Sequence, residues 1–370
     1  MNLNFAAVIA QLGAGAAFRI ARAARAAADY LFNTLLPDRE VPSYHVDSGS
    51  MTIRPTMPGL VGMDSPYPPG GAIEVSTFLE QTAKLAHEVP MTEQALRHLQ
   101  QMLMHLQVSG ADTNERMLQE ALNFLDKVII QPHLDVREWL KGQALAYGAI
   151  DWKFNKKELK VDYGIPANHK LPKRTGNDAY HGSTSKFWDD VRQIRRLLRR
   201  YSEVRIIAHP DTVEAAQYNP ANNMATIAEG DGSVTFRRWS DPNNRVAFSP
   251  DANDQGTILK YGLEGEILLP NGQTAVVPFL DRGVMVGVGI GRRRGGYVGG
   301  QGAADDPLVG VALGYGHVAP TVEGGGVPGL WADLYTPENR PWQLVGRAAQ
   351  NFLPVIEDPD AVVIASTEMP

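Results

Sequence analysis

Residues 112–164, with the sequence DTNERMLQEALNFLDKVIIQPHLDVREWLKGQALAYGAIDWKFNKKELKVDYG, set the arrangement of the rest of the chain. Asp112 followed by Glu115 fits a capping box, in which side chains satisfy the free N–H groups at a helix start. Apolar residues then recur every three or four positions, as on one face of a helix: Leu118, Ala121, Leu122, Leu125, Val128, Ile129, Val136, Trp139, Leu140, Ala144 and Tyr147. Pro132 is expected to kink or restart this helix, because proline lacks the N–H that a helix interior needs.

A β-hairpin is predicted directly after the helix. Gly148 is expected to end the helix, and the residues after it alternate between apolar and polar: Ile150, Trp152 and Phe154, then Leu159, Val161 and Tyr163. The polar residues 155–157 form the turn between the two strands. A long helix joined to a hairpin is a rigid element that carries no catalytic chemistry.

The composition is that of a globular protein. Its 370 residues indicate two or three domains, or one large domain with an insertion. The hydrophobic content of 44% and charged content of 21% exclude a disordered chain, and no apolar run approaches the ~18 residues that span a bilayer. The lack of cysteine excludes disulfides, thiolate catalysis and cysteine–zinc sites. The net charge of −6 argues against a dedicated nucleic-acid binder.

Two N-terminal segments carry the candidate interaction residues. An alanine-rich helix is predicted over residues 5–36, with Arg19, Arg22 and Arg25 sharing one face. That face either is solvated or contacts an acidic neighbour or nucleic acid. Strands are predicted over 41–54 and 72–88. The Pro- and Gly-rich stretch between them suits an extended loop that reaches onto another subunit. The candidate inter-subunit contacts in this loop are its dispersed apolar residues: Met51, Ile53, Leu60, Val61 and Met63.

The remaining chain alternates helices with short strands. The helices are predicted over 92–110, over 186–201 as a basic amphipathic helix, and from a cap at Asp211 to near Tyr218. The strands are predicted at 204–207, 258–261, 266–269, 275–280, 331–335, 342–346, 351–356 and 361–365, and a polar linker at 165–185.

The motifs that could carry chemistry are incomplete. The run Gly287–Gly291 is not followed by the helix pattern that a dinucleotide site needs. Asp47–Ser50 lacks the spacing of a nucleophile elbow, and the nine histidines form no HExxH pair. The arginines 292–294 are interpreted as part of a solvated loop. We therefore predict no catalytic, cofactor-binding or metal-binding residues, and a protein that is not an enzyme.

Short motifs resemble, in the correct order, those of tailed-bacteriophage major capsid proteins of the lambda-type capsid protein E family. They are Leu31-Phe32 to Pro37, Val46-Asp47, Gly148-Ala149-Ile150, Val161-Asp162-Tyr163-Gly164, Val277-Pro278-Phe279-Leu280, a turn at Gly314-Tyr315-Gly316, Leu353-Pro354-Val355 and Pro359-Asp360-Ala361-Val362-Val363. The chain departs from the family pattern in the linker at 165–185 and in the glycine cluster at 291–303.

The resemblance implies the α+β tailed-phage capsid fold, of the Hong Kong ninety-seven type. It divides the chain into an N-terminal arm (1–45), an extended loop (46–90), a peripheral domain with the spine helix (91–185), an axial domain (186–329) and a return to the peripheral domain (330–370). Arg19, Arg22 and Arg25 would then face packaged DNA.

The function implied by the resemblance is a structural protein that self-assembles into the icosahedral shell around double-stranded phage DNA. Its partners would be copies of itself in hexamers and pentamers, the DNA, and scaffolding, portal and decoration proteins, with no membrane. It would be assembled in the host cytoplasm and reside in the virion capsid. An encapsulin-like shell that houses a cargo enzyme is the alternative, and a soluble enzyme is a weaker one.

Overall fold

The computed structural model describes residues 21, 29–54, 72–91, 94, 97, 101, 122–154, 157–230, 232–241, 247–251, 254–268, 274–291, 313–335 and 344–370. Of the predicted helix at 92–110, the described residues 94, 97 and 101 are helical.

The predicted long helix is confirmed over its described part, and we call it the spine helix. It consists of residues 122–124, the π-helical turn η1 (Leu125–Ile130) and the α-helix α6 (Gln131–Tyr147). Pro132 lies just after the junction of η1 and α6. Ile130 and Gln131 keep helical backbone angles there, so the helix changes from a π-helical to an α-helical turn without being interrupted. Gly148 ends α6 in a left-handed conformation with φ 65°, and its N–H bonds the Ala144 carbonyl.

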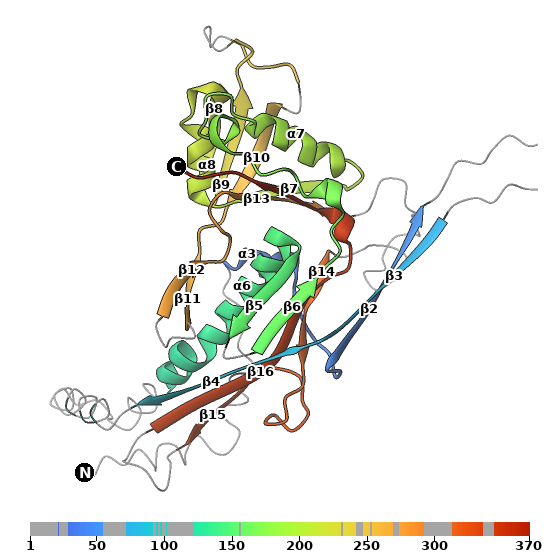
Figure 1. The fold of residues 1–370 in the computed structure, drawn as a ribbon. Helices are drawn as coiled ribbons and strands as arrows, with labels where there is room; N and C mark the ends of the chain where they lie inside the picture. The colour runs from blue at the N-terminus through green and yellow to red at the C-terminus, as the bar shows by residue number, and fades with distance from the viewer. Residues whose placement is uncertain are drawn as a thin grey trace, which may run out of the picture.

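A five-stranded sheet packs along the spine helix (Figure 1). Its central strand is β16 (Leu344–Ile356), which is almost entirely buried. The strands β4 (Ala83–Met91), β14 (Gly314–Ala319) and β15 (Trp331–Tyr335) pair antiparallel with β16. The short strand β1 (Asp38–Glu40) pairs parallel with β14, which brings the N-terminal segment into this sheet.

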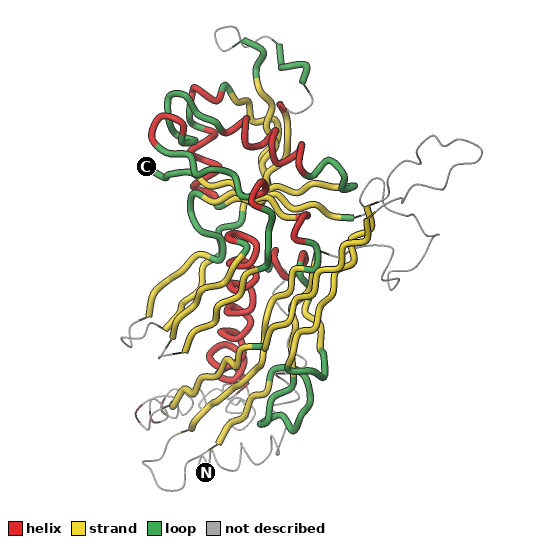
Figure 2. Tube along the Cα trace, turned by 45° about the vertical axis from the view of Figure 1, so that its right-hand side comes forward, coloured by secondary structure: helices red, strands yellow, loops and turns green. Residues whose placement is uncertain are grey.

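A two-stranded ribbon leaves this sheet. The strands β2 (His45–Arg54) and β3 (Ala72–Gln81) pair antiparallel along their whole length and extend away from the body (Figures 1 and 2). The strand expected at 72–88 is therefore two strands, separated at Thr82. Its second part, β4, belongs to the subunit's own sheet, because it finds its hydrogen-bond partners in β16. Of the described part of the expected loop, the ribbon is thus the portion that leaves the sheet.

A six-stranded sheet forms the other end of the molecule (Figure 1). Its order is β17 (Val362–Ser366), β13 (Val284–Ile290), β7 (Glu203–Ala208), β10 (Gln255–Lys260), β9 (Ser233–Arg238) and β8 (Met224–Gly230). The helices α7 (Phe187–Leu197) and α8 (Pro210–Gln217) pack on it. Gly287 lies in β13 and not in a phosphate loop. A Cβ atom there would lie 2.2 Å from Ile194 Cγ2, so this glycine lets α7 approach the sheet.

The smaller elements complete the fold. The predicted hairpin is confirmed as β5 (Ala149–Phe154) and β6 (Lys157–Asp162), and a second hairpin consists of β11 (Glu264–Leu268) and β12 (Thr274–Pro278). The short helices are α3 (Leu31–Leu35), η2 (Ala167–His169), η3 (Gly176–Asp178), η4 (Pro220–Asn222) and η6 (Pro359–Ala361).

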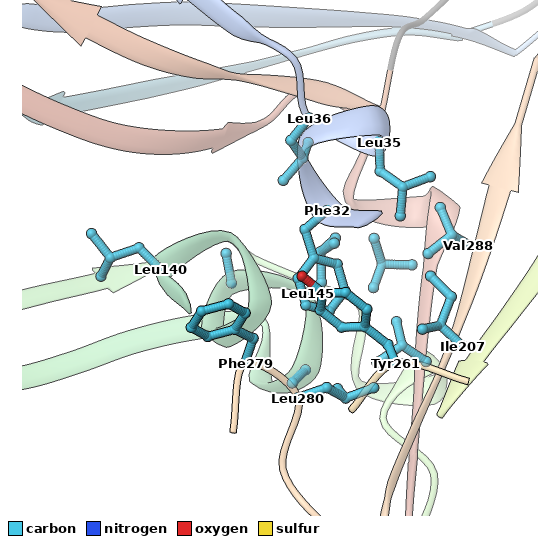
Figure 3. Close-up of a cluster of buried hydrophobic side chains, with 14 of the residues drawn as sticks. Phe32, Leu35, Leu36, Leu140, Leu145, Ile207, Tyr261, Phe279, Leu280 and Val288 are labelled. Atoms are coloured by element: carbon cyan, nitrogen blue, oxygen red, sulfur yellow. The ribbon is translucent and has the colours of Figure 1, made fainter. Parts of the chain in front are cut away.

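One apolar cluster joins the two sheets (Figure 3). Phe32 from α3 and Leu145 from α6 lie in it, together with Tyr261 and Phe279. Ile207 of the six-stranded sheet contributes to the same cluster. Burial of such side chains is worth about 1.5–3 kcal/mol each and holds the two halves together.

The structure differs from the sequence-based expectations at several positions. His209, and not Asp211, caps α8: its Nδ1 accepts the Asp211 N–H at 3.1 Å. Residues 314–316 form the start of β14 and not a turn. Two strands also cross the expected domain boundaries, since β14 lies in the five-stranded sheet and β17 in the six-stranded one. The positions of β14 and β17 are decided by pairing between segments distant in sequence, whereas the cap of α8 is a local contact.

Candidate functional site

A buried ionic cluster joins the N-terminal segment to the spine helix. The carboxylate of Asp38, at the start of β1, accepts hydrogen bonds from Arg137 Nη1 at 2.8 Å and from Lys141 Nζ at 2.6 Å. Lys141 Nζ also donates to Asn33 Oδ1 at 2.7 Å. We call Asp38, Arg137, Glu138 and Lys141 the arm clamp, because they hold residues 29–40 against α6.

Glu138 forms the second half of the arm clamp. Its Oε1 accepts the Phe32 N–H at 2.7 Å and the Tyr261 hydroxyl at 2.6 Å. One carboxylate therefore joins α3, the spine helix and the segment that follows β10. The Glu138 side chain is fully buried, and its Oε2 has no hydrogen-bond partner among the described residues.

The arm clamp is also tied to the central strand β16. Arg137 Nε donates to Gln350 Oε1 at 2.6 Å, and Gln350 Nε2 donates to the His133 carbonyl at 3.0 Å. The cations of Arg137 and Lys141 lie 5.6 and 5.8 Å from the centre of the Phe352 ring. Such cation–π contacts add to the ion pairs where water is excluded.

The electrostatics of the arm clamp are balanced, with two cations facing two carboxylates. Burial opposes ionisation of Asp38, but Arg137 and Lys141 outweigh it and hold the pKa of Asp38 below its ordinary value. Burial lowers the pKa of Lys141 despite the nearby Asp38, and burial raises the pKa of Glu138 despite its donors. Buried ions of this kind are tolerated only when they are paired. The arm clamp therefore fixes the position of one segment relative to another.

None of the residues predicted to form contacts belongs to the arm clamp. Met51 and Ile53 are in β2 of the ribbon, where they pair in register with Val75 and Ile73. The others lie outside the described residues: Arg19, Arg22, Arg25, Leu60, Val61 and Met63.

Sequence reasoning missed the arm clamp because it assigned the helix face by its apolar residues. Tyr147, placed on that face, is 43% exposed, whereas Lys141 is 1% exposed. The available signal was the spacing of Leu134, Arg137, Lys141 and Leu145, which puts two charges between two buried leucines on one face. No pattern in the sequence pointed to Asp38 as their partner.

Within the described ranges, no group of three or more His, Asp or Glu side chains is arranged to hold a metal ion. In the same part of the chain, no helix is long and apolar enough to span a membrane.

Solved structures share this fold. The chain matches a structure described as the capsid protein of a prophage of E. coli CFT073 with a TM-score of 0.51 and 10% identity, over 100% of this chain and 99% of that one. A phage-related protein from Bordetella bronchiseptica RB50 matches with a TM-score of 0.47 and 14% identity, over 95% of each chain. The capsid of a native GTA particle matches with a TM-score of 0.45 and 10% identity, over 93% of this chain and 92% of that one. The first of these matches identifies the predicted α+β tailed-phage capsid fold.

The sequence itself matches one family. No curated protein shows a significant sequence match to this chain. The model of the phage major capsid protein E family, however, matches residues 21–215, which include the β2–β3 ribbon, the spine helix and α7. Because this match covers more than half of the chain and agrees with the fold, the chain belongs to the phage major capsid protein E family.

Proposed function

We propose that this structural capsid protein self-assembles in many copies, as hexamers and pentamers, into an icosahedral shell around double-stranded phage DNA, and that it catalyses no reaction. The observation that carries the proposal is the family match over residues 21–215. That range spans the elements through which a shell subunit could hold its neighbours, namely the N-terminal segment, the ribbon and the spine helix. The encapsulin-like alternative has the same type of fold, and the family match favours the phage capsid.

The ribbon supports an inter-subunit role. An isolated two-stranded ribbon is at best marginally stable in water, and β2 and β3 pair only with each other among the described strands. We propose that the extended loop, with Met51, Ile53, Leu60, Val61 and Met63, makes its main contacts on a neighbouring subunit.

The two sheets correspond to the two proposed domains of the subunit. We propose that the six-stranded sheet with α7 and α8 is the axial domain, and that it includes β17 from the C-terminal segment. The five-stranded sheet with the spine helix is then the peripheral domain, and it includes β14 and β4. Residues 1–45 remain the N-terminal arm.

Electron microscopy of the purified protein tests the shell proposal. Closed shells that contain DNA, or that take it up with the phage packaging proteins, are the expected result. Shells filled with a cargo protein would support the encapsulin alternative, and small particles with a turnover abolished by one substitution would contradict both. Scaffolding, portal and decoration proteins are the proposed further partners, and the host cytoplasm is the proposed place of assembly.

We also propose that Arg19, Arg22 and Arg25 face the packaged DNA. An acidic lumen would repel DNA over a Debye length of about 8–10 Å, so basic side chains are needed on the inner face. Changing all three to Glu should leave shells that hold less DNA, measured as the nucleic-acid absorbance of purified particles. The matched control changes Arg196, Arg199 and Arg200 to Glu, three exposed arginines at the end of α7 and just beyond it. Equal DNA content in the two variants would refute the assignment.

A further inference from the structure

Two histidine rings meet between the five-stranded sheet and the spine helix. His87 lies on β4 and His133 on α6, and His87 Nδ1 is 2.9 Å from His133 Nε2. His87 Nε2 lies 3.3 Å from the Val128 carbonyl of the π-helical turn, and the His133 ring also hydrogen-bonds to the Ala348 carbonyl of β16. The pair therefore connects β4, η1, α6 and β16 at one point.

The number of hydrogens in this arrangement is limited by its geometry. A separation of 2.9 Å between two nitrogens is that of a hydrogen bond with one shared hydrogen. Two neutral imidazoles have two N–H groups, whereas the contact between the rings and the two carbonyls together use three. A singly protonated pair supplies all three. A doubly protonated pair places an N–H on each of the facing nitrogens, and these two hydrogens would collide.

The surroundings also oppose a second charge. His133 is 3% exposed, and burial, the neighbouring His87 and then Arg137 lower its pKa well below the ordinary value. Burial lowers the pKa of His87 as well, against the opposing effect of the Val128 carbonyl. Arg137 reaches the pair from α6 and is itself paired with Asp38. From η1 and β16, the groups that contact the rings are carbonyl oxygens.

We propose that the His87–His133 pair is an acid-sensitive latch, closed while it carries no more than one proton and opened by the second. Opening removes the contact of β4 with η1 and α6, so that the ladder of β4 with β16 loses its support and opens more readily. Since β4 follows the ribbon strand β3 after Thr82, the latch lies on the strand that continues the ribbon into the sheet. Acid would thus loosen the spine helix from the sheet that carries the ribbon. Val128 lies in a π-helical turn, a feature found frequently at functional sites.

Hydrogen exchange of the full-length protein at about pH 7.5 and about pH 5.0, followed by mass spectrometry, tests the latch. After correction for the intrinsic exchange rate, the protection of residues 83–91 and 122–133 should fall as the pH is lowered. The open state binds at least one more proton than the closed state. The fall should therefore steepen below about pH 6.5 and approach about tenfold for each pH unit well below it. Strand β13, in the other sheet, should keep its protection.

Matched variants separate the latch from general acid effects. His87→Gln and His133→Gln should each weaken the pH dependence at residues 83–91, because one buried histidine remains, and the double variant should abolish it. His181→Gln, at an exposed histidine, should behave as the unmodified protein does. Equal protection of the unmodified protein at both pH values would overturn the proposal, even if a variant failed to fold. A pH dependence of unchanged size in the folded double variant would overturn it as well. Neither result depends on whether the protein forms shells.

Discussion

Gly316 shows how a single missing side chain makes room for the arm clamp. A Cβ atom at this position would lie 2.4 Å from Asp38 Oδ1, 2.9 Å from Phe352 Cε2 and 3.0 Å from Lys141 Cε. We expect Gly316→Ala to lower the free energy of unfolding by about 1–3 kcal/mol, because extra volume in a packed core forces its neighbours apart. Urea denaturation measures this change. Gly230→Ala is the control, since nothing lies within 4 Å of a Cβ there. Equal effects at the two glycines would contradict the close packing.

Asp38 is the carboxylate that neutralises two cations of the spine helix. Asp38→Asn leaves Arg137 and the buried Lys141 without their anionic partner, and we expect a loss of about 3–5 kcal/mol in the free energy of unfolding. Thermal and urea denaturation measure it. Lys153→Gln, which removes one exposed ion pair with Glu158, should leave the stability nearly unchanged, because water screens that pair.

The contribution of Asp38 to the stability of the fold depends on pH in a definite direction. Because the pKa of Asp38 is lowered in the folded protein, its ionisation stabilises the fold above its ordinary pKa, and this contribution is lost as the pH falls below about 4. The unmodified protein should therefore lose stability in this range, and Asp38→Asn should show a shallower decline. Parallel curves for the two proteins would show that the arm clamp contributes nothing to acid unfolding.

At the scale of elements, the end of the spine helix determines where the β5–β6 hairpin begins. Gly148 has φ 65°, and a Cβ atom there would lie 2.6 Å from Ile165 Cδ1. Gly164 has nearly the same φ of 64°, but nothing lies within 4 Å of its Cβ position. Gly164→Ala should cost about 1–2 kcal/mol from backbone strain alone. Gly148→Ala should cost more, because Ile165 must also repack, and thermal unfolding compares the two. A larger loss for Gly164→Ala would contradict this account.

At the scale of the whole molecule, we expect the stability of the shell to depend on contacts that the extended loop makes between subunits. Residues 51–63 disperse apolar side chains among Pro and Gly, so the extended loop cannot bury them by itself. Deleting residues 55–70 should leave a folded subunit or capsomer that fails to close heat-resistant shells, as judged by circular dichroism and electron microscopy. Loss of folding in the deletion variant would place the loop in the core, and shells of unchanged heat resistance would remove its proposed role.

Much of this architecture is determined locally and could be predicted from the sequence. The three- and four-residue spacing from Leu122 to Tyr147 and the glycine at 148 specify a helix and its end. The alternation after Gly148 likewise specifies the β5–β6 hairpin. These features follow from neighbouring residues alone, because helix periodicity, caps and tight turns depend on groups only a few positions apart.

The tertiary structure alone decided which distant segments pair and which charges meet. Asp38 meets Arg137 and Lys141 about a hundred positions along the chain, and His87 meets His133 because β4 pairs with β16. For the same reason β14 and β17 entered sheets that their positions in the sequence did not indicate. The sequence does not show which residue a buried charged side chain will pair with. The free energy of burying Asp38, Arg137 and Lys141 becomes acceptable only once the fold has placed them together.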